Sequence, residues 1–386
     1  MKTADLFQNI AKLLYRHLKK IQLVYFTKTI LLSTEYKNNK KAMKYATKSR
    51  ELIKQEMKFV KDYWKCKPLH YIRYGLYNRE LSKDELLDYI PPYYLYNFYN
   101  PTIFTGVDTK KYSDKYSLFK IFTNNEIPTP NVIALYHNRA LSNNLSITDL
   151  FQSLNNGEKL FFKPRYGQGG TGIIVIKNIN GQYLLNNTSI SSKQLEAILN
   201  KNNIDYVIQK GVVQRKDISD INSTSVNTLR AVTQLRNNIP NLSVCVMRIG
   251  RDGKDVDNSH QGGISVQVDV NTGEMNQYAH EEHGYDRTYE SHPDSGFIFK
   301  GFKIKEWDNI KKSILDYAAK LKEVKEIAWD IAIVDEGILV IEINIGYGLD
   351  HLQCCCGGLR RILNIYPTNY NDEYRRIHKK STASMA

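Results

Sequence analysis

The chain has 386 residues, of which 42% are hydrophobic and 24% charged, and this is enough to build two or three packed domains. No run approaches the roughly eighteen apolar residues of a membrane-spanning helix, so an integral membrane protein is not expected and we predict a cytoplasmic one. The formal net charge of +14 suits nucleic acid, an anionic membrane surface or an acidic, phosphate-bearing substrate, and charge alone does not choose among them.

The first part of the chain, residues 1–108, is predicted to be helical. Much of the positive charge lies here, in runs such as residues 37–44, for which a solvated helix face is the default explanation. Apolar side chains recur at spacings of three and four residues, as expected of helices packed on one side. They include Leu6, Ile10, Leu13 and Leu14, and later Ile53, Met57 and Val60.

Two local signals stand near residue 90. Ser82 followed by Asp84 and Glu85 predicts the capped start of a short helix, which the proline pair at 91–92 ends. The tyrosine-dense run 89–99 then leads to the next unit. We favour a packed connecting strap for this run over an aromatic binding surface.

From about residue 110, short apolar strands alternate with helices, and turn signals at 178–181, 271–273 and 335–337 join neighbouring strands. This pattern predicts an α+β body made mostly of antiparallel hairpins. Helices are predicted near 145–155, 191–201 and 305–322. Strands are predicted after the prolines of 125–135 and at 160–163, 172–177, 206–209, 225–236, 243–249, 264–270, 327–334 and 338–343.

A lysine followed by a glycine-rich loop is the first motif that carries chemistry. Lys163 ends a predicted strand, and residues 164–172 contain four glycines. Glycines let backbone N–H groups approach phosphate oxygens, and a lysine at the strand end neutralises them. The spacing is not that of a Walker loop, and a tight hairpin turn is the alternative. The lysine placed before the loop favours a phosphate site.

Residues 329–344 are predicted to form a β-hairpin with its turn at 335–337. Pairing of the two strands brings Asp330 near Glu342 and Asn344, and alternation places the last two on one face. Three oxygen donors there suit Mg²⁺, which also accepts phosphate and water ligands. An edge hairpin with exposed carboxylates is the alternative. Glu342 lies in an apolar run, where an unpaired charge is costly to bury, and this favours a metal.

The third motif places arginines in apolar strands ahead of a glycine turn. Buried arginines such as Arg230 and Arg248 pair with carboxylate or phosphate, either in a ligand or in an ordinary salt bridge. The segment 258–263 follows, where two glycines let the chain turn close to a ligand. His260 in it is either a polar contact or a satisfied core histidine, and we favour the former.

Taken in order, these segments resemble the ATP-grasp superfamily over about residues 110–360. Asp114-Lys115 opening a helix, followed by IPTP at 127–130, resembles the entry to its central domain. The resemblance implies an ATP-grasp fold, in which two α+β subdomains clasp ATP, at 109–370, with a small subdomain at about 155–211. A tail follows at 371–386. The implied contacts to ATP are the lysines Lys115 and Lys163, the phosphate loop at Gly169, Gly170 and Thr171, and the strand residues Gln209, Lys210 and Val212; the implied magnesium ligands are Asp330, Glu342 and Asn344.

Two subfamilies are similar in more detail. SVNTLRAVT, VDNSHQGG, and WDIAI with IEIN are similar to sugar-transfer-associated ATP-grasp proteins of polysaccharide gene clusters, and ribosomal-protein glutamate ligases share part of the pattern. The resemblance implies that Arg230 and Arg248 stabilise the transferring phosphoryl group. It also implies a substrate-binding set of Asn258, His260, Gly262 and Gly263.

The implied activity is an ATP- and Mg²⁺-dependent carboxylate-amine ligase that works through an acyl phosphate. Its substrates would be a small-molecule or saccharide carboxylate, such as a uronic acid in surface polysaccharide synthesis, and an amino acid or other amine. We expect no nucleic-acid partner, and we expect peripheral association with membrane-bound polysaccharide assembly enzymes at the inner face of the membrane. The alternatives are an amino-acid ligase acting on a peptide or protein, and a nucleotide-binding module without catalysis.

Overall fold

A computed structural model describes residues 31, 33–167, 169–255, 257, 262–282 and 287–367. The chain packs as two compact units: one contains the described residues up to Thr102 and those from Gly348 onward, and the other those from Ile103 to Tyr347. Packing therefore groups residues 348–367 with the first unit, whereas the sequence places them in the 109–370 domain. The predicted helix around Leu6–Leu14 and the tail at 371–386 lie outside the described residues.

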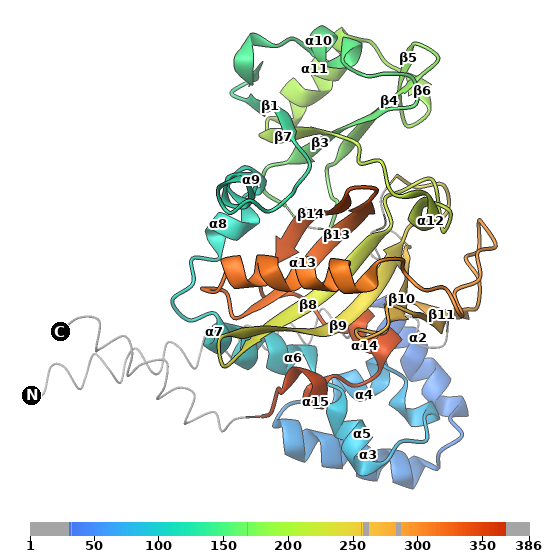
Figure 1. Ribbon diagram of the computed structural model, residues 1–386. Helices are drawn as coiled ribbons and strands as arrows, with labels where there is room; N and C mark the ends of the chain where they lie inside the picture. Colours follow the sequence, from blue (N-terminus) through green and yellow to red (C-terminus); the bar gives the residue numbers. More distant parts are fainter. Residues whose placement is uncertain are drawn as a thin grey trace, which may run out of the picture. The chain divides into compact units, whose positions relative to one another are not determined.

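The first unit, called here the helical unit, consists of short helices, as predicted (Figure 1). Helix α3 (Arg50–Trp64) begins where the Ser49 side chain accepts a hydrogen bond from the backbone of Leu52. The buried Ile53, Val60 and Trp64, together with the half-buried Met57, recur at spacings of four, three and four residues, which is the predicted pattern. No helix in the described ranges is both long and apolar enough to cross a membrane. The other helices are α2 (Thr34–Ala42), α4 (Leu69–Arg73), α5 (Lys83–Asp88), α6 (Pro92–Tyr94), α14 (Asp350–Cys356) and α15 (Arg360–Leu363), with α7 (Asn100–Ile103) at the boundary of the two units.

Both signals near residue 90 have a structural counterpart. Ser82 and Glu85 form a capping box at the start of α5, and the helix ends before the proline pair, as predicted. The tyrosine-rich run is helical and contributes to the core of the helical unit. Tyr94 is buried and packs between Trp64, at 5.0 Å between ring centroids, and Phe98, at 5.5 Å. This packing favours the structural interpretation of the run over a binding surface.

The second unit contains two seven-stranded sheets whose strand pairs are all antiparallel in the described residues, so the predicted α+β class is confirmed. Sheet A has the order β2-β1-β7-β3-β4-β5-β6. Helices α10 and α11 cover one of its faces, where Leu160 and Phe162 join a core with Leu195. Alternation turns Phe161 and Lys163 to the opposite face. The elements are β1 (Val132–His137), β2 (Ala140–Leu141), α10 (Ile147–Gln152), β3 (Lys159–Pro164), β4 (Ile174–Ile179), β5 (Gln182–Leu185), β6 (Thr188–Ser189), α11 (Ser192–Asn202) and β7 (Tyr206–Lys210).

Sheet B has the order β12-β11-β10-β9-β8-β13-β14. Helix α13 lies across one face, where Trp329 and Ile331 pack with Ile310 and Ile314 (Figure 1). Residues that alternate with this core, such as Asp330, point to the other face. The elements are α8 (Lys110–Ser113), α9 (Lys115–Asn124), α12 (Lys216–Ser219), β8 (Thr228–Arg236), β9 (Ile239–Ile249), β10 (Ile264–Val268), β11 (Met275–Glu281), β12 (Thr288–Tyr289), α13 (Trp307–Lys320), β13 (Glu326–Val334) and β14 (Gly337–Asn344).

A glycine turn between β10 and β11 gives a test of the packing on sheet B. Gly273 has φ +73°, and a Cβ there would lie 2.5 Å from Cγ of the buried Trp307. We expect Gly273→Ala to lower the free energy of unfolding by about 2–4 kcal/mol, because the new methyl group strains the backbone and overpacks the indole. Urea denaturation measures the loss.

The matched control is Gly296→Ala. Gly296 also has φ +73°, but no described atom lies within 4 Å of the position that its new methyl group would take, so only the backbone strain of about 1 kcal/mol remains. Equal losses in the two variants would show that the contact with Trp307 contributes nothing.

Candidate active site

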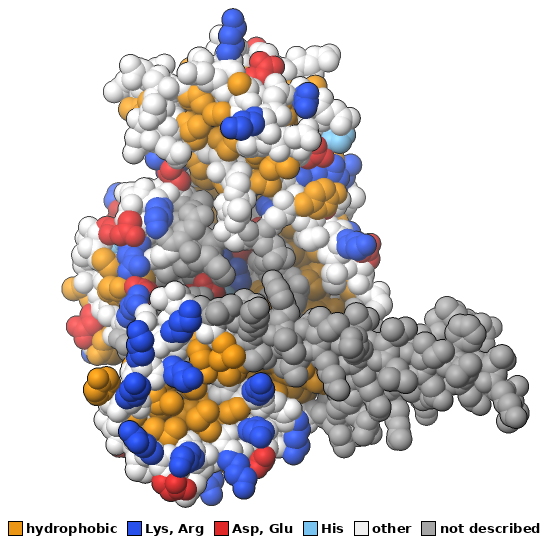
Figure 2. Space-filling model, turned by 180° about the vertical axis from the view of Figure 1, so that it is seen from behind, with side chains coloured by type: hydrophobic (Ala, Val, Ile, Leu, Met, Phe, Trp, Pro, Cys, Tyr) orange, Lys and Arg blue, Asp and Glu red, His pale blue; other side chains and the backbone are white. Residues whose placement is uncertain are grey.

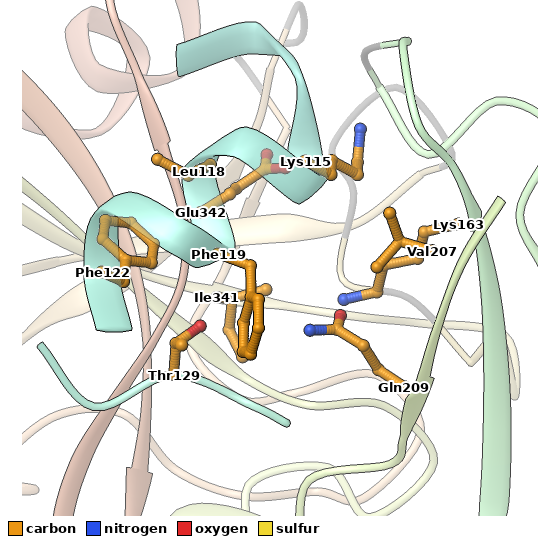
Figure 3. A pocket seen from close by; sticks show the side chains of 10 residues that line it. All are labelled: Lys115, Leu118, Phe119, Phe122, Thr129, Lys163, Val207, Gln209, Ile341 and Glu342. Atoms are coloured by element: carbon orange, nitrogen blue, oxygen red, sulfur yellow. The ribbon is translucent and has the colours of Figure 1, made fainter. Parts of the chain in front are cut away.

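A pocket in the second unit lies among α9, sheet A and strand β14 (Figure 3). It has an empty volume of about 340 Å³, part of which opens to solvent. Its polar groups are two lysine ammonium groups, a carboxylate, an amide and a hydroxyl, and the rest of the wall is apolar. The lining residues are Lys115, Leu118, Phe119, Phe122, Thr129, Lys163, Val207, Gln209, Ile341 and Glu342.

The two lysines reach the pocket from different elements. Lys163 extends from β3, on the face of sheet A opposite to the core. Burial lowers the pKa of Lys163 to about 8, against the attraction of the Glu342 carboxylate. Lys115 is the first residue of α9, and its Nζ donates to the backbone oxygen of Gly167 at 2.9 Å. Two lysine ammonium groups that line one pocket favour an anionic ligand.

Asp114 explains why α9 begins at Lys115. Its carboxylate caps the helix by accepting from the backbone of Tyr116 and Ser117, and it pairs with Arg165 through bonds of 2.9 and 2.7 Å. Hydrogen bonds and Arg165 hold the pKa of Asp114 well below its usual range, although burial opposes this. Arg165 follows Lys163 by two residues, so the cap ties the helix start to the end of β3.

The glycine-rich loop between β3 and β4 has left-handed backbone at its glycines. Gly167, Gly169, Gly170 and Gly172 all have positive φ, a conformation that other residues rarely adopt. Gly169 and Thr171 are exposed and Gly170 is half-buried, so backbone groups of the loop are accessible. A Cβ at Gly172 would also lie 3.1 Å from Pro164.

The three predicted residues on and after β7 have different environments. Gln209 lines the pocket, and its Nε2 donates to the backbone oxygen of Pro130 at 2.8 Å. Lys210 lies on β7 with its ammonium group 3.2 Å from Glu158, away from the pocket lining. Val212 follows the strand and is half-buried. The side chain of Gln209 is thus placed for a ligand contact, whereas Lys210 offers only its backbone.

The predicted hairpin of β13 and β14 is confirmed, and its register places Asp330 opposite Glu342. Asp330 also lies opposite Arg230 on β8, so the three side chains form a row across three strands. Asn344 is two residues from Glu342 on the same face, and its Nδ2 donates to Asp330 at 3.3 Å. The hairpin therefore brings together the predicted oxygen donors.

Asp330 is held by two arginines, a pairing that the sequence leaves open. Arg230 donates to it through Nε and through Nη2, the latter at 2.9 Å, and Nη1 of Arg248 donates at 3.1 Å. Burial raises the pKa of Asp330, but the two guanidinium groups outweigh it and hold the pKa at about 2. The carboxylate is thus charged at all physiological pH values.

Glu342 has the opposite electrostatic environment. Burial and the negative charge of Asp330 raise the pKa of Glu342, while Lys115, Arg230 and Lys163 act against this. Two facing carboxylates of this kind are stabilised by a cation placed between them. Asp330, Glu342 and the amide oxygen of Asn344 are hard donors, so the residues present fit a Mg²⁺ ion.

Sequence reasoning did not identify Asp257, whose carboxylate contacts Arg248, one of the two arginines that hold Asp330. Its carboxylate accepts from the Thr228 backbone at 3.2 Å and from Arg248 at 3.4 Å. The residue directly precedes the 258–263 segment singled out above, and its partners Thr228 and Arg248 lie on β8 and β9, 29 and 9 residues earlier in the chain. The apolar pocket wall, including Phe119 and Ile341, was also missed, because its apolar side chains look like ordinary core positions in the sequence.

The predicted substrate-binding residues are only partly described. Asn258 and His260 lie outside the described residues. Gly262 has φ +95°, and a Cβ there would lie 3.5 Å from Lys254 and 3.6 Å from Arg251, so the turn places its backbone beside two basic side chains. Gly263 is buried.

Comparisons with known proteins agree with this architecture. A family model described as sugar-transfer associated ATP-grasp matches residues 93–364. A search of the curated proteins gives no match.

Three solved structures are similar to this chain at low sequence identity. D-alanyl-alanine synthetase A from Vibrio cholerae O1 is 11% identical with a TM-score of 0.40, covering 72% of this chain and 66% of that one. D-alanine-D-alanine ligase from Coxiella burnetii is 9% identical with a TM-score of 0.38, covering 71% and 62%. An ATP-grasp RimK domain protein from Sphaerobacter thermophilus is 10% identical with a TM-score of 0.33, covering 62% and 61%. The chain spans less than two thirds of the length of each of these structures.

Proposed function

The chain belongs to the sugar-transfer associated ATP-grasp family, and we propose that it is an ADP-forming ligase that uses ATP to join a carboxylate to an amine. The observation that carries this proposal is the pairing of two kinds of charge around one pocket. Lys115 and Lys163 supply positive charge from α9 and sheet A, and Glu342 lines the same pocket from β14, beside Asp330. Cations for phosphates next to carboxylates for a metal suit phosphoryl transfer from ATP.

Each part of the pocket has a role in binding ATP. The apolar side chains of Phe119, Val207 and Ile341 offer a surface for a base, and Gln209 offers an amide beside it. Lys163 and Lys115 neutralise phosphate oxygens, assisted by backbone N–H groups of the glycine-rich loop. Asp330, Glu342 and Asn344 would hold Mg²⁺, which when bound neutralises charge on the phosphates.

The proposed reaction has two steps. A carboxylate oxygen of the first substrate attacks the γ-phosphorus, the bond to the β–γ bridging oxygen breaks, and ADP leaves. The amine of the second substrate then attacks the carbonyl carbon of the acyl phosphate, inorganic phosphate leaves, and the amine loses a proton. The lysines stabilise the transferring group electrostatically, and no side-chain nucleophile is required.

Arg230 and Arg248 have their proposed effect through Asp330. Both donate to its carboxylate, which keeps it ionised and fixes its orientation for a metal. They also place positive charge beside Glu342, whose pKa Arg230 lowers. We therefore assign the two arginines to positioning the carboxylates, in addition to the phosphoryl contact that the resemblance implies.

The family description supports a saccharide substrate. We propose that the carboxylate belongs to a uronic acid or a related sugar acid of a surface polysaccharide or its precursor, and that the amine is an amino acid or a similar small molecule. Arg251 and Lys254 lie beside the Gly262 turn, but Arg251 pairs with Glu281 at 3.1 Å and Lys254 lies 3.8 Å from Asp252, so these charges do not by themselves select an acidic substrate.

The experiment that tests this function measures ADP and phosphate release by the purified chain with Mg²⁺-ATP and a panel of sugar acids, amino acids and amines. Release that requires both a carboxylate and an amine supports the proposal, and mass spectrometry of the product identifies the amide. An amide formed only on peptides would replace the saccharide by a peptide substrate. ATP that binds but is never hydrolysed with any pair would refute a ligase.

The lowered pKa of Lys163 predicts a pH dependence of ATP binding. As pH rises through about 8, the lysine of the free protein loses its proton, so phosphate binding weakens above this value and is unaffected well below it. Calorimetric titration with a nonhydrolysable ATP analogue between about pH 7.5 and 9.5 avoids the phosphate's own titration. Affinity is expected to fall about tenfold per pH unit once the lysine titrates.

The matched control is Lys163→Gln, which binds more weakly but has no group that titrates there. Its affinity is expected to stay constant over the same range. Constant affinity in the unmodified protein would contradict a contact between Lys163 and the phosphates.

A further inference from the structure

A row of basic side chains follows the solvent face of α3 in the helical unit. Arg50, Lys54, Lys58 and Lys61 recur at spacings of four, four and three residues, which places them on one side of the helix. All four are exposed, whereas Ile53, Val60 and Trp64 on another side are buried. This row, called here the α3 basic row, has no role in the ATP pocket.

The surroundings of the row add charge of the same sign. Residues 33–67 contain ten lysines and one arginine against four acidic side chains, which is half of the net charge of the chain. Two of those acids are engaged, since Glu56 pairs with Lys48 at 2.9 Å and Glu51 lies 3.9 Å from Lys54. Within the described ranges, Arg50, Lys58 and Lys61 have no acidic partner. The positive potential is therefore not cancelled locally.

Exposed apolar side chains accompany these charges. Tyr45, the last residue of the 3₁₀ helix Met43–Tyr45 that precedes α3, is 85% exposed, whereas Leu52, which is 42% exposed, lies on the side of α3 opposite to the row. Figure 2 shows Lys and Arg side chains around an exposed hydrophobic area on the helical unit. Exposed basic side chains together with an exposed aromatic ring that has an apolar body and a polar tip suit a membrane interface.

We propose that the α3 basic row and Tyr45 bind the surface of an anionic phospholipid bilayer. The composition favours a bilayer over a specific anion, because lysine is a point charge that suits a diffuse surface potential, whereas bidentate recognition of a phosphate or a sugar carboxylate favours arginine. An exposed helix face also suits an extended surface better than a single buried ligand. The proposal is independent of the ligase activity.

The test is co-sedimentation of the full chain with vesicles of phosphatidylcholine alone and of phosphatidylcholine with phosphatidylglycerol. Binding is expected only to the anionic vesicles, and it should decrease at least tenfold between about 0.05 M and about 0.5 M salt. Each basic side chain near such a surface strengthens binding about fivefold. Replacing Arg50, Lys54, Lys58 and Lys61 together by glutamine should therefore weaken binding by at least about 100-fold.

The control removes the same charge elsewhere. Lys193, Lys201, Lys303 and Lys322 are exposed lysines of the second unit, and their joint replacement by glutamine should leave vesicle binding within about twofold. Far-UV circular dichroism and ADP release should be unchanged in both variants, so a loss of binding cannot be attributed to unfolding. Tyr45→Ser should weaken vesicle binding without changing the charge.

Three results would overturn the proposal. One is equal binding to neutral and anionic vesicles. Another is equal loss of binding in the two four-residue variants, which would make the effect one of net charge. The third is binding to a short DNA duplex or to an anionic polysaccharide with no binding to vesicles, which would assign the surface to a different partner.

Discussion

Replacing Asp330 by asparagine is expected to lower the free energy of unfolding by about 3–5 kcal/mol and to abolish ligase turnover. The carboxylate is 3% exposed and neutralises two buried guanidinium groups, those of Arg230 and Arg248. An amide has the same shape but no charge, so the buried Arg230 would lose its carboxylate partner and Arg248 would keep only the contact with Asp257 at 3.4 Å. Urea denaturation measures the loss of stability.

A double-mutant cycle separates the ion pair from the effect of the new amide. Arg230→Gln removes one of the two cations, so Asp330→Asn should cost less in that background than in the unmodified protein. The difference between the two costs measures the coupling. Additive losses would show that Arg230 and Asp330 contribute independently, contrary to the paired geometry.

Glu342→Gln is expected to lower turnover by at least about 100-fold, or about 3 kcal/mol of transition-state stabilisation, while leaving the fold as stable as before or more stable. Burial and the charge of Asp330 raise the pKa of Glu342, so its ionised form is unfavourable in the protein without metal. Glutamine removes this repulsion and also removes a hard anionic ligand. Steady-state ADP release and urea denaturation give the two values.

The pH dependence of stability tests whether the pKa of Glu342 is raised in the folded protein. The pKa of Glu342 in the folded protein is raised above its ordinary value of 4.5. Between 4.5 and the folded pKa, the folded protein holds a proton that the unfolded chain has released. The free energy of unfolding therefore falls as pH rises above 4.5 toward the folded pKa. Glu342→Gln should lack this part of the dependence. Unchanged turnover in the variant would contradict the metal role, and a large loss of stability would contradict the electrostatic account.

The sequence predicts the hairpin that carries Asp330 and Glu342, but it does not predict the arginine partners of Asp330. The hairpin of β13 and β14, its turn and the proximity of Asp330 to Glu342 were predictable, because strand alternation and a turn signal are local. The pairing of Asp330 with two arginines was not predictable, because Arg230 and Arg248 are 100 and 82 residues away in the chain. Only the order of strands in sheet B makes them neighbours. The expected loss of stability in Asp330→Asn therefore follows from the fold and not from the sequence of the hairpin.

The same distinction holds for the fold. The apolar strands 160–163, 206–209 and 338–343 were found close to their observed bounds, since buried strands carry continuous or alternating apolar patterns. Strand β11 was missed because its residues, MNQYAHE, are mostly polar and only Met275 and Ala279 are buried. Edge strands such as β6 and β12 are too short for any period to be visible.

The proposed nucleotide site was also more predictable than the proposed acceptor site. Lys163 and the glycines after it form a local motif, and positive φ at Gly169 and Gly170 accounts for the residue type. Asp257 and the pair Arg251 and Lys254 are positioned by contacts between loops and strands that no short pattern encodes. The proposed ATP site is accordingly better defined than the proposed substrates.

The most direct test of the account follows the oxygen atoms. A carboxylate substrate found in the screen is labelled with ¹⁸O and incubated with the purified chain, Mg²⁺-ATP and the amine, and the released phosphate is analysed by mass spectrometry. An acyl-phosphate ligase transfers one carboxylate oxygen to phosphate, so we expect one ¹⁸O atom in each phosphate and ADP as the nucleotide product. Unlabelled phosphate, or release of AMP and pyrophosphate, would contradict the mechanism.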